Sequence, residues 1–393
     1  MKQQELANTL FEVAKDTKQH MILLSTDEHA LAGFPYAEYQ NIMESLCKIY
    51  HVLELPDTLA PHIQNLNGMT DDAHAYIHAY IGTLNHMIKE AILYRGQYCI
   101  IRRSDPVPGL ASHIMTNLGQ IVTALNEGYI PVIDMQFAEN AFSCLNQNHM
   151  ENAWELFFRQ PFENQTLSDA SNAEICTLKD GIPAFMPYYS MDQLTNPNLI
   201  KLWQSAMKEY MPFSDALLQV TKKAFQSLPF EGNRILGVLC RGTDYTTLRP
   251  HNHPVQPDAD TVIAKAKDTM QQYDCAYCYL ATEDDAILSR FRDAFGDRLL
   301  TSQNTYFNKE QKMLLSQTMA DSPTQLFDKN VEYLTSLYLL GQCHCLLAGR
   351  TSGSVVALLL SEKPYAYTHF WNEGKYGVDD IQRLQSLTIA SAL

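Results

Sequence analysis

Long apolar runs and basic charge are both scarce in this sequence of 393 residues. No stretch approaches the roughly 18 to 20 apolar residues of a membrane-spanning helix, and the N-terminal segment lacks the apolar core of a secretory signal. The 29 basic residues are outnumbered by 44 acidic ones, which leaves a formal net charge of −15. This charge argues against a binder of nucleic acid or anionic membranes, because both need a basic face. A phosphate ligand, in contrast, needs only two or three local cations.

Cysteines are few, and their number, nine, is odd. Most lie within apolar runs, which predicts buried, reduced thiols and a cytoplasmic location rather than a disulfide framework. Cys275 and Cys278 have the spacing of a zinc-binding pair, with Cys343 and Cys345 further on. Both pairs fall in predicted buried strands, whose successive side chains point to opposite faces. We therefore expect no metal at these cysteines.

The fingerprints of common nucleotide sites are missing too. The sequence has neither the GxxxxGK[ST] of a P-loop nor the GxGxxG of a dinucleotide-binding fold. Asp258 and Asp260 have the DxD spacing of metal-dependent glycosyltransferases, but they follow Pro257 where a helix is predicted to begin. This position favours acidic residues at a helix N-terminus over metal ligands. We expect neither a metal nor a cofactor.

The apolar pattern divides the chain into three regions. Residues 1–93 are predicted to be helical, residues 94–230 to form a first α/β domain, and residues 231–393 to form a second, Rossmann-like domain. Beyond residue 232, strands and helices alternate in the manner of a doubly wound parallel sheet. Because such sheets bind ligands at the carboxyl ends of their strands, the loops that follow the strands carry the candidate chemistry.

The first of these loops follows the apolar run 235–240. A guanidinium donates two parallel, charge-assisted hydrogen bonds to a phosphate, and a glycine lets the backbone approach a ligand closely. A purely structural pair of arginine and aspartate in a turn is the alternative. The candidate residues are Arg241, Gly242, Thr243, Asp244 and Tyr245, with His253 further along the same loop.

The second loop follows the strand predicted at 276–281. Thr282 is a natural N-cap, and Glu283, Asp284 and Asp285 would stabilise the positive end of the next helix. In the functional alternative, one of these carboxylates faces the cleft and accepts hydrogen bonds from a base or a sugar hydroxyl.

Two further loops have small residues at a helix start. Helix N-termini with exposed N–H groups bind phosphate, although an ordinary capped helix has the same composition. In the first half of the chain, the turn from Gly109 through Ser112 to His113 is either a ligand-facing loop or a tight strand-to-helix turn. In the second half, the candidates are Arg350, Thr351, Ser352, Gly353 and Ser354.

Together, the segment Arg241–Asp244, the strand end Leu280–Asp284 and the turn at Ser352 resemble the fucosyltransferase superfamily. Its members, which include α1,6-fucosyltransferases and protein O-fucosyltransferases, carry an HxRxxD-type motif, an ATDD-like strand end and a late serine-containing turn in this order. The turn Gly109–His113 resembles their glycine-rich loop. The chain is most similar to bacterial glycosyltransferase-like proteins of surface-polysaccharide loci, which share RGTDY, ATED and the NAWE of Asn152–Glu155. The resemblance covers about residues 95–370.

This resemblance implies a GT-B-like fold, with two Rossmann-like domains facing a cleft and the helical region preceding them. The second domain would bind a nucleoside-diphosphate sugar, with GDP-fucose as the expected donor, and the first would face a bacterial glycan or protein acceptor. Arg241 would hold the β-phosphate, Ser352 with its neighbouring N–H groups would hold the phosphates from the other side, and Gly109–His113 would approach the donor. Transfer would be an inverting displacement without a metal.

The sequence departs from the family pattern at three points. Leu239 replaces the histidine two positions before the arginine. An expected aspartate aligns near Ser336, where Glu332, one turn earlier, is the candidate substitute. The carboxylate expected as general base has no counterpart near Leu248, which leaves Asp244, His253 and Glu283 as candidates. A nucleotide-sugar epimerase or hydrolase of the same shape, or a non-catalytic nucleotide-sugar-binding protein, are the alternatives.

Overall fold

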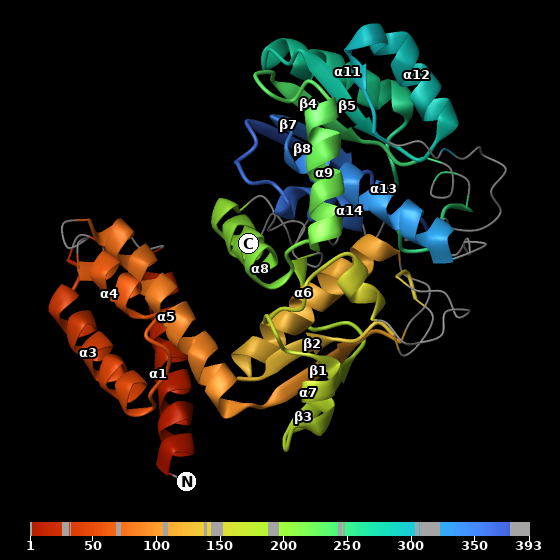
Figure 1. The fold of residues 1–393 in the computed structure, drawn as a ribbon. Helices are drawn as coiled ribbons and strands as arrows, with labels where there is room; N and C mark the ends of the chain where they lie inside the picture. The colour runs from red at the N-terminus through yellow and green to blue at the C-terminus, as the bar shows by residue number, and fades with distance from the viewer. Residues whose placement is uncertain are drawn as a thin grey trace. The chain divides into compact units, whose positions relative to one another are not determined.

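A computed structural model describes most of the chain (Figure 1). Residues 1–100, 122–132 and 165–178 form one compact unit, and residues 101–121, 133–164 and 179–393 form the other. Within the described ranges, no helix combines the length and apolarity that crossing a membrane requires. The three-region division drawn from the sequence stays a prediction. The described residues are 2–25, 31, 33–67, 72–104, 109–136, 140–142, 152–187, 196–242, 246, 248–302, 306 and 323–377.

The N-terminal region is helical, as predicted. Apolar residues of α1 buried at helical spacing, from Ala7 to Ala14, pack along α5, whose amino end is capped by the side chain of Asp72. The last turn of α5 ends at Gly96, which has a φ of 58° and so forms a left-handed C-cap. The helices are α1 (Lys2–Leu24), α3 (Tyr36–Val52), α4 (Ala60–Asn67) and α5 (Ala73–Arg95).

A three-stranded sheet with strand order β2-β1-β3 follows the helical region. Helix α6 connects β1 to β2 as a βαβ unit. Two hydrogen bonds, Tyr98 N–H to Ile175 O (2.9 Å) and Ser104 N–H to Asp180 Oδ1 (2.9 Å), join the corresponding ends of β1 and β3, so these strands run parallel. The elements are β1 (Tyr98–Arg102), α6 (Leu110–Asn126), β2 (Ile130–Ile133), η1 (Ala153–Leu156), α7 (Leu167–Asn172), β3 (Cys176–Asp180), α8 (Pro197–Tyr210) and α9 (Asp215–Ser227).

The second sheet has five parallel strands in the order β6-β5-β4-β7-β8. The central strands β4 and β7 are buried along their whole length, as strands covered by helices on both faces must be. The chain therefore starts in the middle, builds outward through β5 and β6, and returns to add β7 and β8 on the other side. The strands are β4 (Ile235–Leu239), β5 (Tyr277–Ala281), β6 (Leu299–Leu300), β7 (Cys345–Gly349) and β8 (Tyr367–Trp371).

Helices cover both faces of this sheet (Figure 1). On one face, Leu236 and Val238 of β4 pack with the apolar sides of α11 and α12. On the other face, α13 packs against β4 and β5, and α14 packs against α13. The predicted α/β fold class, with doubly wound topology and a helical N-terminal region, is confirmed. The helices are α11 (Ala259–Gln272), α12 (Asp285–Phe295), η4 (Gly296–Arg298), α13 (Pro323–Gly341) and α14 (Ser352–Leu359).

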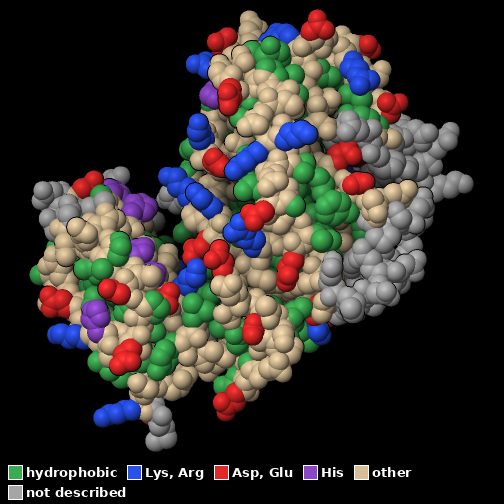
Figure 2. Space-filling model, in the orientation of Figure 1, with side chains coloured by type: hydrophobic (Ala, Val, Ile, Leu, Met, Phe, Trp, Pro, Cys, Tyr) green, Lys and Arg blue, Asp and Glu red, His purple; other side chains and the backbone are tan. Residues whose placement is uncertain are grey.

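On the face shown in Figure 2, acidic and basic side chains are interspersed, so the excess of negative charge does not gather there into one patch.

Gly237 allows α13 to approach β4 closely. A Cβ added at Gly237 would lie 2.9 Å from Cys343 Sγ and 3.0 Å from Leu340 Cδ2. We expect Gly237→Ala to lower the free energy of unfolding by about 1–3 kcal/mol through overpacking. The measurement is urea unfolding, with a lower midpoint and an unchanged slope.

The control is Cys343→Ala, which removes the nearest atom. The double variant should recover part of the loss in a double-mutant cycle. Simple additivity of the two single changes would show that this contact is not the cause.

Candidate functional site

Three candidate loops lie side by side because their strands are neighbours. In the parallel register, Leu239 at the end of β4 is opposite both Ala281 of β5 and Ala348 of β7. Arg241, Glu283 and Arg350 therefore follow adjacent strand ends. The strand order reverses between β4 and β7, which is where open α/β sheets form their ligand crevice.

Arg241 is paired with a carboxylate. Its Nε lies 3.3 Å from Glu283 Oε1, and the same oxygen accepts a hydrogen bond from Gly242 N–H at 3.1 Å. The two side chains are only 20% and 15% exposed, so the ion pair is largely shielded from water. Glu283 thus fixes the direction of the guanidinium and the backbone that follows it. Glu283, one of the three candidates for the general base, is thus the carboxylate of this ion pair.

Gly242 has no space for a side chain. An added Cβ would come within 2.7 Å of Ile287 Cδ1 and would also collide with the carboxylate of Asp284. Asp284 is buried and caps α12, its Oδ1 accepting from Ile287 N–H at 3.0 Å. The prediction of Thr282 as the N-cap is therefore wrong, and the close packing of these two turns explains the glycine.

The start of α14 is a capping box. Thr351 Oγ1 accepts from Ser354 N–H at 3.2 Å, and Ser354 Oγ accepts from Thr351 N–H at 3.1 Å. Both side chains are buried, so their hydroxyls serve the helix. The first-turn N–H groups of Ser352 and Gly353 point along the helix axis and have no acceptor within the helix. Of the residues predicted in this loop, Ser352, Gly353 and Arg350 are not part of the capping box.

Tyr333 was missed by the sequence reasoning, which singled out its neighbour Glu332. The Tyr333 hydroxyl lies at the start of α14, 2.6 Å from where a Cβ on Gly353 would stand. Glu332 is half-buried, and its charge contributes, after the larger effect of burial, to raising the pKa of Tyr279 and Tyr306. No local sequence pattern marks Tyr333, because it lies on α13 and comes close to the start of α14 only through tertiary packing.

Only part of the remaining first loop lies within the described residues. Thr243, Asp244 and Tyr245 lie outside the described residues. His253 is half-buried, and its backbone carbonyl accepts from Tyr376 N–H at 2.9 Å. The loop is thereby pinned to the segment after β8.

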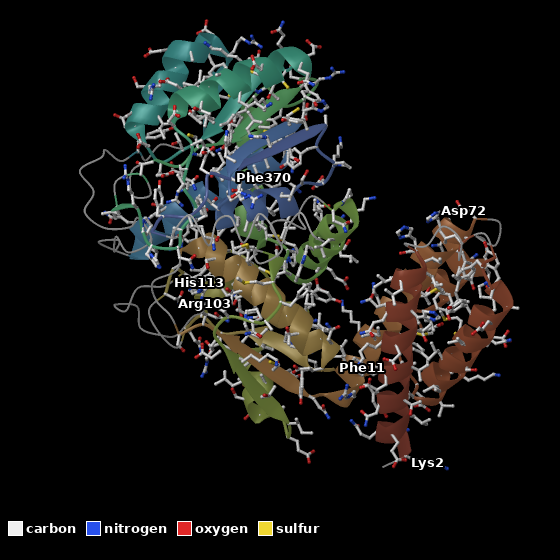
Figure 3. All side chains as sticks on the ribbon, turned by 180° about the vertical axis from the view of Figure 1, so that it is seen from behind. Lys2, Phe11, Asp72, Arg103, His113 and Phe370 are labelled. Atoms are coloured by element: carbon white, nitrogen blue, oxygen red, sulfur yellow. The ribbon has the colours of Figure 1, made fainter. Side chains whose placement is uncertain are left out.

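The candidate residues of the first half of the chain, Gly109, Ser112 and His113, lie at the amino end of α6, and no hydrogen bond or ion pair joins them to the loops after β4, β5 and β7 among the described residues. Arg103 is buried at the end of β1, and its Nη1 donates to Ser112 Oγ (3.0 Å) and Thr116 Oγ1 (2.8 Å). His113 is completely buried on the same helix, and Figure 3 shows it close to Arg103. Gly109 immediately precedes the helix and accepts its first backbone hydrogen bonds.

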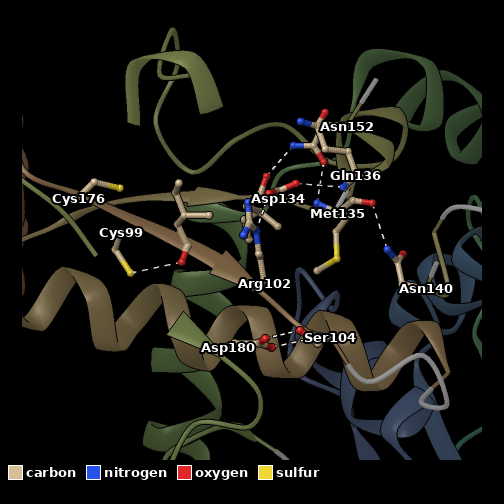
Figure 4. A network of polar contacts seen from close by, with 12 residues as sticks. Cys99, Arg102, Ser104, Asp134, Met135, Gln136, Asn140, Asn152, Cys176 and Asp180 are labelled. Atoms are coloured by element: carbon tan, nitrogen blue, oxygen red, sulfur yellow. Dashed lines mark hydrogen bonds and ion pairs between the residues drawn. The ribbon is translucent and has the colours of Figure 1, made fainter. Parts of the chain in front are cut away.

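The NAWE segment braces the end of β2 (Figure 4). The Asn152 side chain accepts from Met135 N–H at 3.0 Å and donates to the carbonyl of Ile133. Nearby, Asp134 forms an ion pair with Arg102 at 2.7 Å. These contacts assign Asn152 a structural role at the carboxyl end of β2.

The remaining motifs have structural places as well. Asp258 caps α11 by accepting from Asp260 N–H and Thr261 N–H, which confirms the prediction of a helix N-terminus. Cys275 and Cys345 are both buried. Among the described residues, no three histidines, cysteines or acidic side chains gather as a metal site would require.

Burial, and secondly the Arg103 guanidinium, lower the pKa of His113 to about 3. An unfolded histidine titrates near 6.5, so below that pH the unfolded state binds the extra proton and the protein is destabilised. Between pH 7 and 5 the loss should be about 2 kcal/mol. Urea unfolding of wild type and His113→Phe across this range checks it, because the variant lacks this contribution. Parallel pH curves for the two proteins would contradict the assignment.

No protein-family model and no curated protein matches this sequence. Solved structures that are similar to the chain include fucosyltransferase NodZ from Bradyrhizobium, at 14% identity and a TM-score of 0.39, covering 66% of this chain and 92% of that one. POFUT1 in complex with GDP is similar at 10% identity and a TM-score of 0.44, covering 72% and 99%. A variant of Arabidopsis thaliana FUT1 in complex with GDP is similar at 9% identity and a TM-score of 0.42, covering 78% of each chain. These neighbours are enzymes of the kind that the sequence motifs resemble.

Proposed function

We propose that this chain is a glycosyltransferase that takes a sugar from a nucleoside diphosphate, with GDP-fucose as the donor, and transfers it to a glycan or protein acceptor. The observation that carries the proposal is that two arginine-bearing loops follow neighbouring strand ends, at β4 and β7, where the strand order reverses. Arg241 follows β4, and Arg350 with the start of α14 follows β7. Crevices at this point of a doubly wound sheet are the usual place of a bound nucleotide.

The diphosphate would lie between these two loops. On one side, the Arg241 guanidinium offers a planar fork that matches a phosphate. On the other, the N–H groups of Ser352 and Gly353 and the positive end of the α14 dipole favour negative charge. Donors on both sides would also stabilise the charge that develops on the diphosphate as the sugar leaves.

Glu283 would act as a positioning residue for Arg241 rather than as the base. Its Oε1 already accepts from Gly242 N–H and pairs with the guanidinium, as described above. In this role the Oε1 oxygen is engaged in orienting Arg241 and Gly242, and it would not take the proton of an acceptor hydroxyl. The base for an inverting displacement would then come from Asp244 or His253 of the same loop.

The first test is donor binding, followed as thermal stability with GDP-fucose and with the UDP-, dTDP- and CMP-sugars. A ligand that binds the native state stabilises it by about 2.7 kcal/mol at a hundredfold excess over its dissociation constant. Arg241→Lys should weaken GDP-fucose binding by roughly tenfold or more, because a charge-assisted hydrogen bond contributes about 1.5–3 kcal/mol.

The matched control is Arg234→Lys, in the same domain but 58% exposed and paired only loosely with Asp274 at 3.8 Å. It should bind the donor as the wild type does. If none of the four classes of nucleotide sugar shifts the unfolding temperature, the proposal fails. Donor turnover without any acceptor would instead indicate a hydrolase or an epimerase.

Glu283→Gln separates a positioning role from a basic one. Loss of a general base typically costs 10²- to 10⁴-fold in the chemical step with donor binding intact. For a positioning residue, we expect weaker donor binding and a higher KM, with kcat reduced much less. Steady-state kinetics with the donor varied measures both quantities, and a collapse of kcat at unchanged KM would make Glu283 the base.

A further inference from the structure

Histidines are concentrated in the N-terminal part of the chain. Seven of the 13 histidines precede residue 90, and two of them, His62 on α4 and His86 on α5, stack their rings on each other. The ring centroids are 4.8 Å apart, and the ring planes are inclined by 18°. Because the ordinary pKa of histidine lies close to neutral pH, a mild change of acidity can alter the charge of this pair.

Helix α4 is held to the protein by few groups. Of its eight residues only Leu66 is buried, and Leu59, just before the helix, is buried as well. The helix packs against α5, which carries His86 (Figure 1). An isolated helix of this length is unstable in water, so α4 keeps its helical structure only while it is docked on α5. Small changes at the α4–α5 contact therefore decide whether α4 is folded.

His86 is tied to the segment that leads into α4. Its Nε2 lies 3.0 Å from Thr58 Oγ1 and 3.3 Å from the Tyr50 hydroxyl. The Tyr50 hydroxyl also donates to the carbonyl of Pro56 at 2.9 Å. His86 thus contacts groups from α3, from α4 and from the turn that joins these two helices.

Protonation of His86 is disfavoured while α4 is docked. Its pKa is lowered by burial first, then by the His62 ring, and then by Lys89. These charged groups are on α4 and α5, and none is on α1, which also packs along α5. A histidine released into water titrates near 6.5, so docking of α4 is fully stabilised above that pH and loses stability as the pH falls below it.

The carboxylates of this region act on Tyr50 rather than on His86. Burial raises the pKa of Tyr50, and Glu90 and Asp57 raise it further. Neither carboxylate is among the groups that shift the pKa of His86. His51 is exposed, and its ring centroid lies 6.4 Å from that of Tyr50. Among the described residues, no carboxylate therefore offsets a positive charge on His86.

We propose that α4 is a pH-controlled flap, docked on α5 at neutral pH and released in mildly acidic solution when the stacked pair of His62 and His86 gains a proton. Two rings at this separation stack well when both are neutral and repel each other when both are charged. Release exposes Leu59 and Leu66, each only 3% exposed in the docked state. The flap does not depend on the proposed function.

Hydrogen exchange of the α4 backbone amides, corrected for the intrinsic exchange rate at each pH, measures the undocked population. Between about pH 7.5 and 5.5, this population should rise by up to about tenfold, the ratio expected when only the undocked histidine takes up a proton. The amides of α3 and α5 should keep their protection, because only α4 is released.

His86→Phe keeps an aromatic ring in the stack but cannot take up a proton, so the protection of α4 should no longer change with pH. His62→Phe removes the repulsion between two charged rings and should reduce the response, which provides a second variant if the first does not fold. The matched control is His78→Phe, an exposed histidine two turns earlier on α5, and it should respond to pH as the wild type does.

An unchanged exchange rate of wild-type α4 over this range would overturn the inference, as would a pH response that persists in full in His86→Phe or in His62→Phe. Equal loss of protection in α3, α4 and α5 would also overturn it, because it would indicate general unfolding of the N-terminal helices rather than release of α4.

Discussion

The parallel pairing of β4 with β5 on one side and with β7 on the other is the constraint on which the candidate site depends. Because all three strands run the same way, their carboxyl ends stop at one level, with Leu239 opposite Ala281 and Ala348. Residues more than 100 positions apart, Arg241 and Arg350, are thereby brought onto neighbouring loops. No local interaction could do this, so the integrity of the site is inseparable from the register of the sheet.

Within that frame, the Arg241–Glu283 pair has a second consequence. Without a carboxylate partner, a largely buried guanidinium would destabilise the fold, because its charge would be buried and uncompensated. Glu283 supplies the compensation through its ion pair with the Arg241 Nε. In the proposed function, a diphosphate would join an arginine that is already oriented, which lowers the entropy cost of binding.

Much of the second domain could be predicted because buried parallel strands are continuous apolar runs. The strands expected at 235–240 and 276–281 are β4 and β5, each within one residue of the expected bounds. The details of the site could not be predicted. From the sequence, the hydroxyls of Thr351 and Ser354 could bind a phosphate or cap the helix. Only the structure shows that both form a capping box at the start of α14. Tyr333 reaches the site through tertiary packing, of which its sequence neighbourhood carries no sign.

Two buried asparagines of the first half of the chain differ in their hydrogen bonding. The amide of Asn152 bonds to the backbone of Ile133, Met135 and Trp154, so this part of the fold can provide partners for a buried carboxamide. Asn117 on α6 is 0% exposed, against 9% for Asn152, and its amide has no partner among the described residues. Burial alone therefore does not decide whether a carboxamide is satisfied, because Asn152 lies beside backbone groups at the end of β2 and no described group meets the amide of Asn117.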